Sequence, residues 1–154
     1  MNNNVTRLLK NKNIDFDLIE LATHNKLSAV NVASLLHVKP EIVYKTIVLK
    51  TKGIPVLALI QSDSTVDTKK VAVFLNEKKV KVASHHDAEL LTGLQTGGIS
   101  ALALLHKSFQ VLIDNNIINL SEFIISAGQR GYQLRISPAD FISLTKARIA
   151  PISL

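Results

Sequence analysis

One lysine, Lys45, interrupts an apolar and β-branched stretch at residues 43–49 that otherwise has the composition of a buried strand. An ammonium group in that position either reaches water along its aliphatic stem or is held, partly desolvated, beside a negative group. In a site of reduced dielectric, such a cation stabilises a phosphate or a developing oxyanion strongly. A strand-edge lysine that guards against aggregation explains the same residue, and both interpretations stay open here.

Two adjacent glycines, Gly97 and Gly98, are the second feature that could contact a substrate. Such a turn can direct backbone N–H groups at an oxyanion or a ribose, although a tight turn between a helix and a strand is the simpler explanation of the glycines taken alone. No Gly-Lys-Ser/Thr follows, so a P-loop is excluded. Ser100 is a weak candidate nucleophile, because Leu102 stands where a nucleophile elbow requires its last glycine.

Metal and thiol chemistry have little support in this chain. It contains no cysteine, which removes disulfides, thiolate metal sites and a cysteine nucleophile. His85 and His86 are adjacent, so on a helix they point about 100° apart and do not chelate as an i, i+4 pair does. No histidine has a Ser/Asp context that suggests a triad. A solvated helix start explains these histidines more simply than a metal site does.

The composition is that of a basic globular domain. The 154 residues include 18 Lys+Arg against 12 Asp+Glu, for a net charge of +6, and 47% are hydrophobic. Such a surface favours anionic partners, although solubility alone also explains it. Lys69 and Lys70 belong to the densest basic cluster, which could follow an RNA backbone, although such clusters are more often solvated helix faces. Without a signal peptide or a membrane-length apolar stretch, we expect a soluble, cytoplasmic protein and no membrane partner, and nothing demands more than a monomer.

Apolar periodicity and capping residues predict one mixed α/β (α+β) domain over residues 1–154. Helices are expected from Val5 and after four N-cap residues, Ser28, Asp67, Ser84 and Ser137. Strands are expected at residues 15–21, 42–50, 54–61, 80–83, 99–105, 110–114, 121–126 and 132–136. Because several strands are joined by short turns, a mixed, mostly antiparallel sheet with peripheral helices is favoured over a regular βαβ array.

Four segments, in the same order along the chain, resemble the YbaK family of aminoacyl-tRNA editing domains, which also occur inserted in bacterial prolyl-tRNA synthetases. The resemblance covers nearly the whole chain, from about Val5 to about Ala147. Its segments are Val43-Tyr44-Lys45-Thr46, Asp67-Thr68-Lys69-Lys70-Val71-Ala72, Thr92-Gly93 with Gly97-Gly98-Ile99-Ser100, and Ser126-Ala127-Gly128-Gln129-Arg130-Gly131.

The resemblance implies a free-standing deacylase that hydrolyses the ester of a mischarged tRNA, usually a proline tRNA carrying cysteine or alanine, with prolyl-tRNA synthetase as a potential partner. It implies that Lys45 is the key active-site residue and that the segment from Gly97 to Ala101 borders the aminoacyl pocket. The resemblance also implies that no metal or organic cofactor is needed, because hydrolysis is expected to use the substrate's own ribose hydroxyl or thiol. The expected catalytic residues are Lys45, Gly97 and Gly98. The expected substrate-binding residues are Leu21, Thr46, Ile99, Ser100, Ala101, Ser126, Gly128, Arg130 and Gln133. Lys69 and Lys70 are expected to bind tRNA.

Four residues depart from the family pattern. Ala101 replaces a proline and Ala103 a glycine in the loop, so a fixed φ is lost. Leu21 stands where cysteine-type enzymes tend to carry a tyrosine, and Gln133 replaces an aspartate found in several relatives. The edited amino acid therefore stays open. So do two other hypotheses, a non-catalytic tRNA-binding module of the same fold and, more remotely, a serine hydrolase that uses Ser100.

Overall fold

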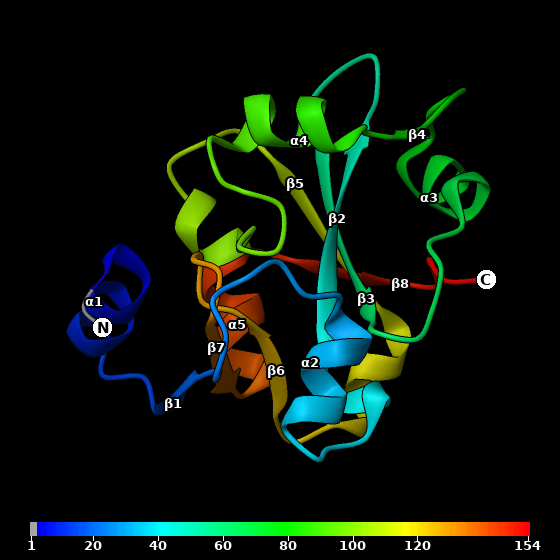
Figure 1. Cartoon of the computed structure of the whole chain (residues 1–154). Helices are drawn as coiled ribbons and strands as arrows, with labels where there is room; N and C mark the ends of the chain where they lie inside the picture. The colour runs from blue at the N-terminus through cyan, green and yellow to red at the C-terminus, as the bar shows by residue number, and fades with distance from the viewer. Residues whose placement is uncertain (1–2) are drawn as a thin grey trace.

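Two β-sheets form the centre of the structure, a computed structural model that describes residues 3–154 (Figure 1). The larger sheet has the order β4-β2-β3-β5-β8. Its strands are β2 (Tyr44–Lys50), β3 (Val56–Gln61), β4 (Lys81–Val82), β5 (Gln110–Asp114) and β8 (Arg148–Ala150). The smaller sheet has the order β1-β7-β6 and consists of β1 (Phe16–Glu20), β6 (Phe123–Ser126) and β7 (Tyr132–Ile136).

Strand directions confirm the predicted mixed, mostly antiparallel arrangement, but in two sheets. β2 pairs antiparallel with β3 and with β4, and all pairs of the smaller sheet are antiparallel. Parallel pairs join β3 to β5 and β5 to β8. A single bridge between Val43 and Ile124 connects the two sheets just before β2 begins. The start of β2 is therefore the place where the larger sheet contacts the smaller one.

Helices begin where the capping residues predict. They are α1 (Asn4–Asn11), α2 (Ala29–Leu35), α3 (Thr68–Leu75), α4 (His85–Thr92) and α5 (Pro138–Thr145), and they surround the sheets (Figure 1). The side chains of Ser28, Asp67, Ser84 and Ser137 each accept a hydrogen bond from a first-turn N–H of the helix that follows. Among the described residues, no helix is long and apolar enough to cross a membrane.

The strand predicted at residues 99–105 is wrong. Ser100 accepts a hydrogen bond from the N–H of Leu102 at 3.2 Å and starts a 3₁₀ helix, η2 (Ala101–Leu104). A short apolar run fits a buried strand and a buried helical turn equally well, and here the serine cap selects the turn. Strand β8 was not predicted, because its three residues become a strand only by pairing with β5.

A cluster of aromatic side chains fixes the start of β2 in the core. The ring of Phe123 on β6 makes edge-on contacts with Tyr44 on β2 and with Phe141 on α5, each at a centroid distance of 5.4 Å. Tyr44 is 3% exposed, and both phenylalanines are fully buried. The smaller sheet and α5 therefore hold one end of β2 rigidly in place.

Candidate functional site

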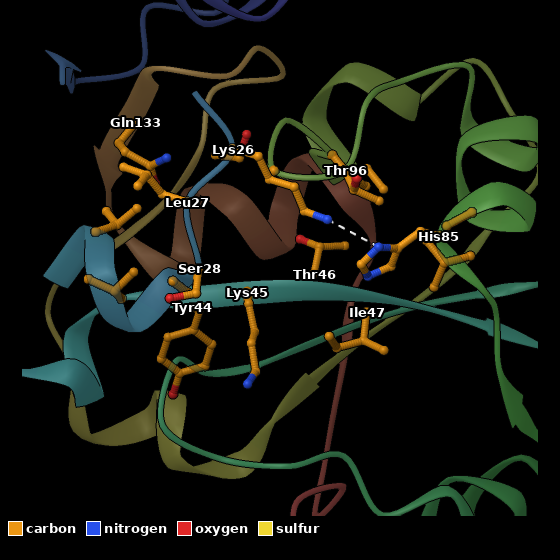
Figure 2. Close-up of a pocket in the computed structure, with 18 of the residues that line it drawn as sticks. Lys26, Leu27, Ser28, Tyr44, Lys45, Thr46, Ile47, His85, Thr96 and Gln133 are labelled. Atoms are coloured by element: carbon orange, nitrogen blue, oxygen red, sulfur yellow. Dashed lines mark hydrogen bonds between the residues drawn. The ribbon is translucent and has the colours of Figure 1, made fainter. Parts of the chain in front are cut away.

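A cavity of about 280 Å³ lies along β2. It is formed by β2, the end of β4 and the start of α4, the start of α2 with the segment before it, the glycine loop after α4, and the adjacent ends of β6 and β7 (Figure 2). Its polar and glycine lining residues are Lys26, Ser28, Tyr44, Lys45, Thr46, His85, Thr96, Gly97, Ser126 and Gln133.

The cavity takes the place of a missing strand. β4 pairs with β2 only at Leu49 and Lys50, and the last contact of that pair is the hydrogen bond from the N–H of Ala83 to the carbonyl of Val48, at 2.9 Å. At the other end, Val43 bridges to the smaller sheet. Between these points the outer edge of β2 has no partner strand among the described residues, so its backbone is accessible from the cavity.

Lys45 lies on this strand with its side chain partly buried. Its ammonium donates a hydrogen bond to the carbonyl of Ser62 at 3.1 Å. Ser62 is itself fixed, because its N–H donates to Val43 at 2.7 Å and its hydroxyl donates to Pro40 at 2.6 Å. Burial lowers the pKa of Lys45 below its ordinary value, and the nearby carboxylate of Asp63 opposes that shift. The site thus holds a partly desolvated cation on a neutral acceptor, with capacity to bind an anion.

Side chains, rather than strand pairing, hold the glycine loop at residues 93–98. The carboxylate of Glu89 on α4 accepts hydrogen bonds from the N–H of Thr96 at 2.8 Å and from its hydroxyl at 3.2 Å. The backbone hydrogen bond is the main cause of a lowered pKa at Glu89. From the opposite side, Nε of Arg130 donates to the carbonyl of Thr96 at 2.7 Å. One residue, Thr96, therefore links α4 to the turn between β6 and β7.

Gly97 and Gly98 allow this loop to lie against its neighbours. Gly97 has a φ of +90°, and a Cβ there would lie 3.3 Å from Cγ of Lys26. A Cβ on Gly98 would lie 2.9 Å from the backbone nitrogen of Arg130, closer than side chains pack. The N–H of Gly98 also donates to Gln95 at 2.8 Å, and Gly98 does not line the cavity.

The predicted pair of oxyanion donors is therefore reduced. The N–H of Gly98 is used inside its own turn, so the structure does not present it to a ligand. Gly97 lines the cavity, and its N–H has no hydrogen-bond partner among the described residues. Ile99, also at the cavity, has a free N–H by the same criterion. In this part of the chain, the backbone donors that remain for a substrate are those of Gly97 and Ile99.

Sequence reasoning missed a polar pair at the cavity, Lys26 and His85. The ammonium of Lys26 lies 3.1 Å from Nδ1 of His85, the first residue of α4, as the dashed line in Figure 2 shows. In the same view, Lys45 extends from β2 away from this pair. No pattern around Lys26 marks it as special, and His85 attracted notice only as a metal ligand. Among the described residues, no group of three or more His, Cys, Asp or Glu side chains could hold a metal.

Gln133 and Ser126 form a neutral polar wall of the cavity. They are cross-strand partners of β7 and β6, and both line the cavity. Gln133 is 6% exposed, and its side-chain amide has no hydrogen-bond partner among the described residues. Figure 2 shows it facing the same space as Leu27 and Lys26. A side-chain amide that lines the cavity without a protein partner among the described residues is available to a bound molecule.

Several residues expected to bind substrate lie outside the cavity lining. Leu21 is 5% exposed and packs in a core cluster with Val32, Val43 and Ile124, so its contribution is to packing. Ser100 and Ala101 are each 2% exposed; Ser100 caps η2, and Ala101 is its first residue.

The second glycine turn acts as support for the first. Gly128 has a φ of +92°, and a Cβ there would lie 3.3 Å from the Cβ of Ala103 in η2. Arg130 reaches the site only through its hydrogen bond to Thr96. Arg130 therefore positions the glycine loop, Gly128 packs against η2, and neither residue lines the cavity.

Lys69 and Lys70, the expected tRNA contacts, start α3. Their N–H groups donate to the cap residue Asp67, and the ammonium of Lys70 donates to the carbonyl of Ser153 at 2.8 Å. Figure 1 shows α3 near the C-terminus, on the far side of β2 and β3 from the glycine loop. The cavity and this basic helix start are therefore separate parts of the surface.

Comparison with known proteins connects this arrangement to one family. Residues 23–144 match the model of the aminoacyl-tRNA editing domain. The chain is 32% identical over 152 residues to a protein of Enterococcus faecalis named as a candidate Cys-tRNA(Pro)/Cys-tRNA(Cys) deacylase, EbsC, with 97% of this chain and 92% of the relative covered. It is also 27% identical over 118 residues to a proline–tRNA ligase of Syntrophus aciditrophicus. That match covers 77% of this chain but only 20% of the ligase.

Solved structures show the same fold at lower sequence identity. The crystal structure of a hypothetical protein, APE2540, superposes with a TM-score of 0.89 at 20% identity and covers 97% of this chain and 99% of that one. A second crystal structure, described as a candidate trans-editing enzyme for prolyl-tRNA synthetase, has a TM-score of 0.83 at 18% identity and covers 100% and 99% of the two chains. At these identities the structural likeness concerns the fold alone.

Proposed function

The chain belongs to the aminoacyl-tRNA editing domain family, and from this premise we propose that it hydrolyses the ester bond of a mischarged aminoacyl-tRNA. The observation that carries the proposal is Lys45, a partly desolvated ammonium beside a cavity of about 280 Å³ along an unpaired strand edge. Such a cation suits the polyanionic end of a tRNA, and the cavity suits one small acyl group.

The proposed reaction needs little from the protein beyond positioning. An aminoacyl ester is already activated, so orientation and stabilisation of the oxyanion can suffice. Lys45 would hold the terminal phosphate or the carbonyl region, and the free N–H of Gly97 would face the carbonyl oxygen. Water adds to the carbonyl carbon, the bond from that carbon to the ribose oxygen breaks, and the ribose oxygen leaves with a proton. The products are the free amino acid and the uncharged tRNA.

Ser100 is a poor nucleophile in this structure. It is 2% exposed, its hydroxyl is occupied by the N–H of Leu102, and it does not line the cavity. The attacking group is therefore assigned to water, directed by the substrate's own ribose hydroxyl. This assignment needs no metal-binding residue.

For the substrate we propose a proline tRNA that carries a small wrong amino acid such as cysteine or alanine. The name of the Enterococcus relative and the match to proline–tRNA ligases support this choice. A closed wall excludes large side chains sharply, whereas a missing methylene changes discrimination by only about 1–3 kcal/mol. Because the cavity discriminates weakly between small amino acids, a synthetase or another factor that recognises the tRNA body would supply the remaining specificity.

A panel of charged tRNAs tests the proposal. Proline tRNA charged with cysteine, alanine or proline is incubated with the protein, and the remaining ester is followed over time against a protein-free control. We expect faster loss of at least one of the two wrong esters than of the prolyl ester. Salt-sensitive tRNA binding without any loss of ester would instead indicate the non-catalytic tRNA-binding module.

A further inference from the structure

The backbone of Thr46, which lines the cavity, has no role in the reaction proposed above. In a strand, successive residues direct their N–H and C=O groups to opposite edges. Val48 uses its carbonyl on the outer edge, where it accepts from Ala83, whereas Val43 uses its carbonyl toward β3, where it accepts from Ser62. Thr46 lies two residues from Val48, so its N–H and C=O both face the outer edge.

No residue that the structure describes satisfies these two groups. β4 ends its pairing with β2 at Leu49, before it could reach Thr46. Among the described residues, no hydrogen bond reaches the backbone of Thr46 from that edge, and Thr46 lines the cavity. Figure 2 places Thr46 beside the Lys26–His85 pair, within the hollow that the strand edge forms. One donor and one acceptor, spaced as in a β-ladder, are therefore offered to a ligand.

The charges of the cavity restrict which ligand groups can bind the N–H and C=O of Thr46. Its lining residues, all within the described part of the chain, include Lys26, Lys45 and His85 but no carboxylate. Glu89 does not line the cavity, and its carboxylate is bonded to Thr96. The positively charged amino group of an aminoacyl ester therefore finds no ionic partner and needs a neutral acceptor, such as a backbone carbonyl.

We propose that the aminoacyl group docks on Thr46 as a single residue of an added antiparallel strand, a mode that rests on the proposed function. The substrate's α-ammonium donates to the carbonyl of Thr46, and the N–H of Thr46 donates to the acyl carbonyl oxygen. Only an antiparallel pair exchanges both bonds between the same two residues, because a parallel partner bonds two different residues of the ligand. A one-residue ligand can therefore satisfy both groups only in this way.

This docking also sets which part of the substrate lies next to each of the other site residues. The antiparallel direction sends the ester oxygen toward Lys45, on the N-terminal side of Thr46, where the ribose and its phosphate would follow. The acyl side chain then lies on the same face of the sheet as the side chain of Thr46. When the carbonyl oxygen becomes an oxyanion, its bond from the Thr46 N–H strengthens, so this donor stabilises the transition state more than the ground state.

An amide-to-ester replacement tests the donor directly. Thr46 is replaced by the corresponding α-hydroxy acid, which removes its N–H and keeps the side chain. We expect kcat/KM for the mischarged tRNA to fall about a hundredfold. The matched control is the same replacement at Leu18, whose N–H faces the open outer edge of β1. The N–H of Leu21, three residues further on, points the other way, to Gly131 just before β7. Activity of the control should stay within about twofold.

Binding gives a readout that does not depend on turnover. Adenosine that carries alanine through a stable 3′-amide keeps the α-ammonium and the acyl carbonyl. Its dissociation constant should rise about tenfold in the Thr46 ester variant and stay unchanged in the Leu18 variant. Replacing the substrate's α-amino group by a hydroxyl should also lower the catalysed rate, after correction for the spontaneous rate, by about tenfold in the natural protein.

The outcomes separate the two proposals. If the natural protein cleaves mischarged tRNA and the Thr46 ester variant has equal activity and equal affinity for the amide, the docking is overturned but the proposed function is not. A natural protein that leaves every ester of the panel intact overturns the proposed function, and the docking with it. Selective loss in the Thr46 variant, with the Leu18 variant intact, supports both.

Discussion

The two walls of the cavity are built in different ways. The β2 wall, with Lys45 and Thr46, is fixed by backbone pairing to β3 from Tyr44 to Leu49 and by the packing of Tyr44 on Phe123. The loop wall, residues 93–98, is fixed by a few side-chain bonds that converge on Thr96. One wall therefore depends on sheet topology and the other on individual side chains.

This difference predicts how each wall responds to substitution. On β2, a side chain can be exchanged without moving the backbone, because the ladder hydrogen bonds remain, so an effect there reports chemistry. In the loop, the side chains and the missing Cβ atoms decide where the backbone lies, so an effect there reports shape. Stability and activity should separate on β2 and change together in the loop.

The largest expected effect on activity comes from Lys45→Met on the β2 wall. Loss of the ammonium should lower kcat/KM at least about a hundredfold, because it removes a preorganised charge from a partly desolvated site. The free energy of unfolding should change little, since a desolvated cation is replaced by an apolar chain of similar length. Lys50→Met on the same strand is the control, because Lys50 is exposed and pairs with Asp87 at 2.9 Å. Equal activity of both variants would exclude a role for Lys45.

Gly98→Ala should give the largest loss of stability in the loop. The new Cβ would lie 2.9 Å from the backbone nitrogen of Arg130, so the two loops must separate. We expect a decrease of about 1–3 kcal/mol in the free energy of unfolding, measured with urea, and a parallel loss of activity. Gly53→Ala is the matched control, since the nearest atom there, Oγ1 of Thr51, lies 4.0 Å away. Similar results for both glycines would contradict the close packing.

Arg130→Met should have a smaller effect of the same kind. It removes the 2.7 Å hydrogen bond to Thr96 but keeps an aliphatic stem beside Gly97. We expect about a tenfold decrease in kcat/KM and a loss of about 1 kcal/mol in stability, because the bond has a charged donor but is only partly buried. Arg148→Met, which removes the contact with the ring of Phe74 at 5.2 Å, should leave activity unchanged. Lost stability with full activity at Arg130 would show that the loop position is irrelevant to catalysis.

The smallest expected effect is the pH dependence of stability that Lys45 causes. Burial holds the pKa of Lys45 in the folded protein below its ordinary value of 10.5. Between these two values the unfolded chain binds more protons, so stability rises with pH through that window. Urea unfolding from neutral pH to about 10.5 should show the natural protein gaining stability relative to Lys45→Met. A constant difference between the two proteins would mean that Lys45 is fully solvated.

Local signals in the sequence were sufficient for most elements and for part of the site. The capping residues Ser28, Asp67, Ser84 and Ser137 each have their effect within one helical turn, so the helix starts were predictable. Lys45 stood out because an ammonium in an apolar strand is unusual. The paired glycines stood out because few residues can replace them.

Long-range contacts explain what the sequence did not reveal. The stretch at residues 99–105 carries no periodicity that separates a strand from a buried turn, and β8 exists only because β5 lies beside it. Lys26 and His85 are 59 residues apart and meet only because α4 and the segment before α2 border the same cavity. Leu21 was expected to contact substrate, but it lies in the core beside Val43.

The sequence by itself determined the family, the helix starts and the identity of the main cation, because each depends on residue types and short spacings. The tertiary structure decided which backbone groups are free. Gly98, predicted to be a donor, uses its N–H in a turn, whereas Thr46 keeps both backbone groups unpaired because β4 leaves β2 at Leu49. Hydrogen-bond saturation of a backbone group depends on which strand or loop lies beside it, and that neighbour is fixed only when the whole chain has folded.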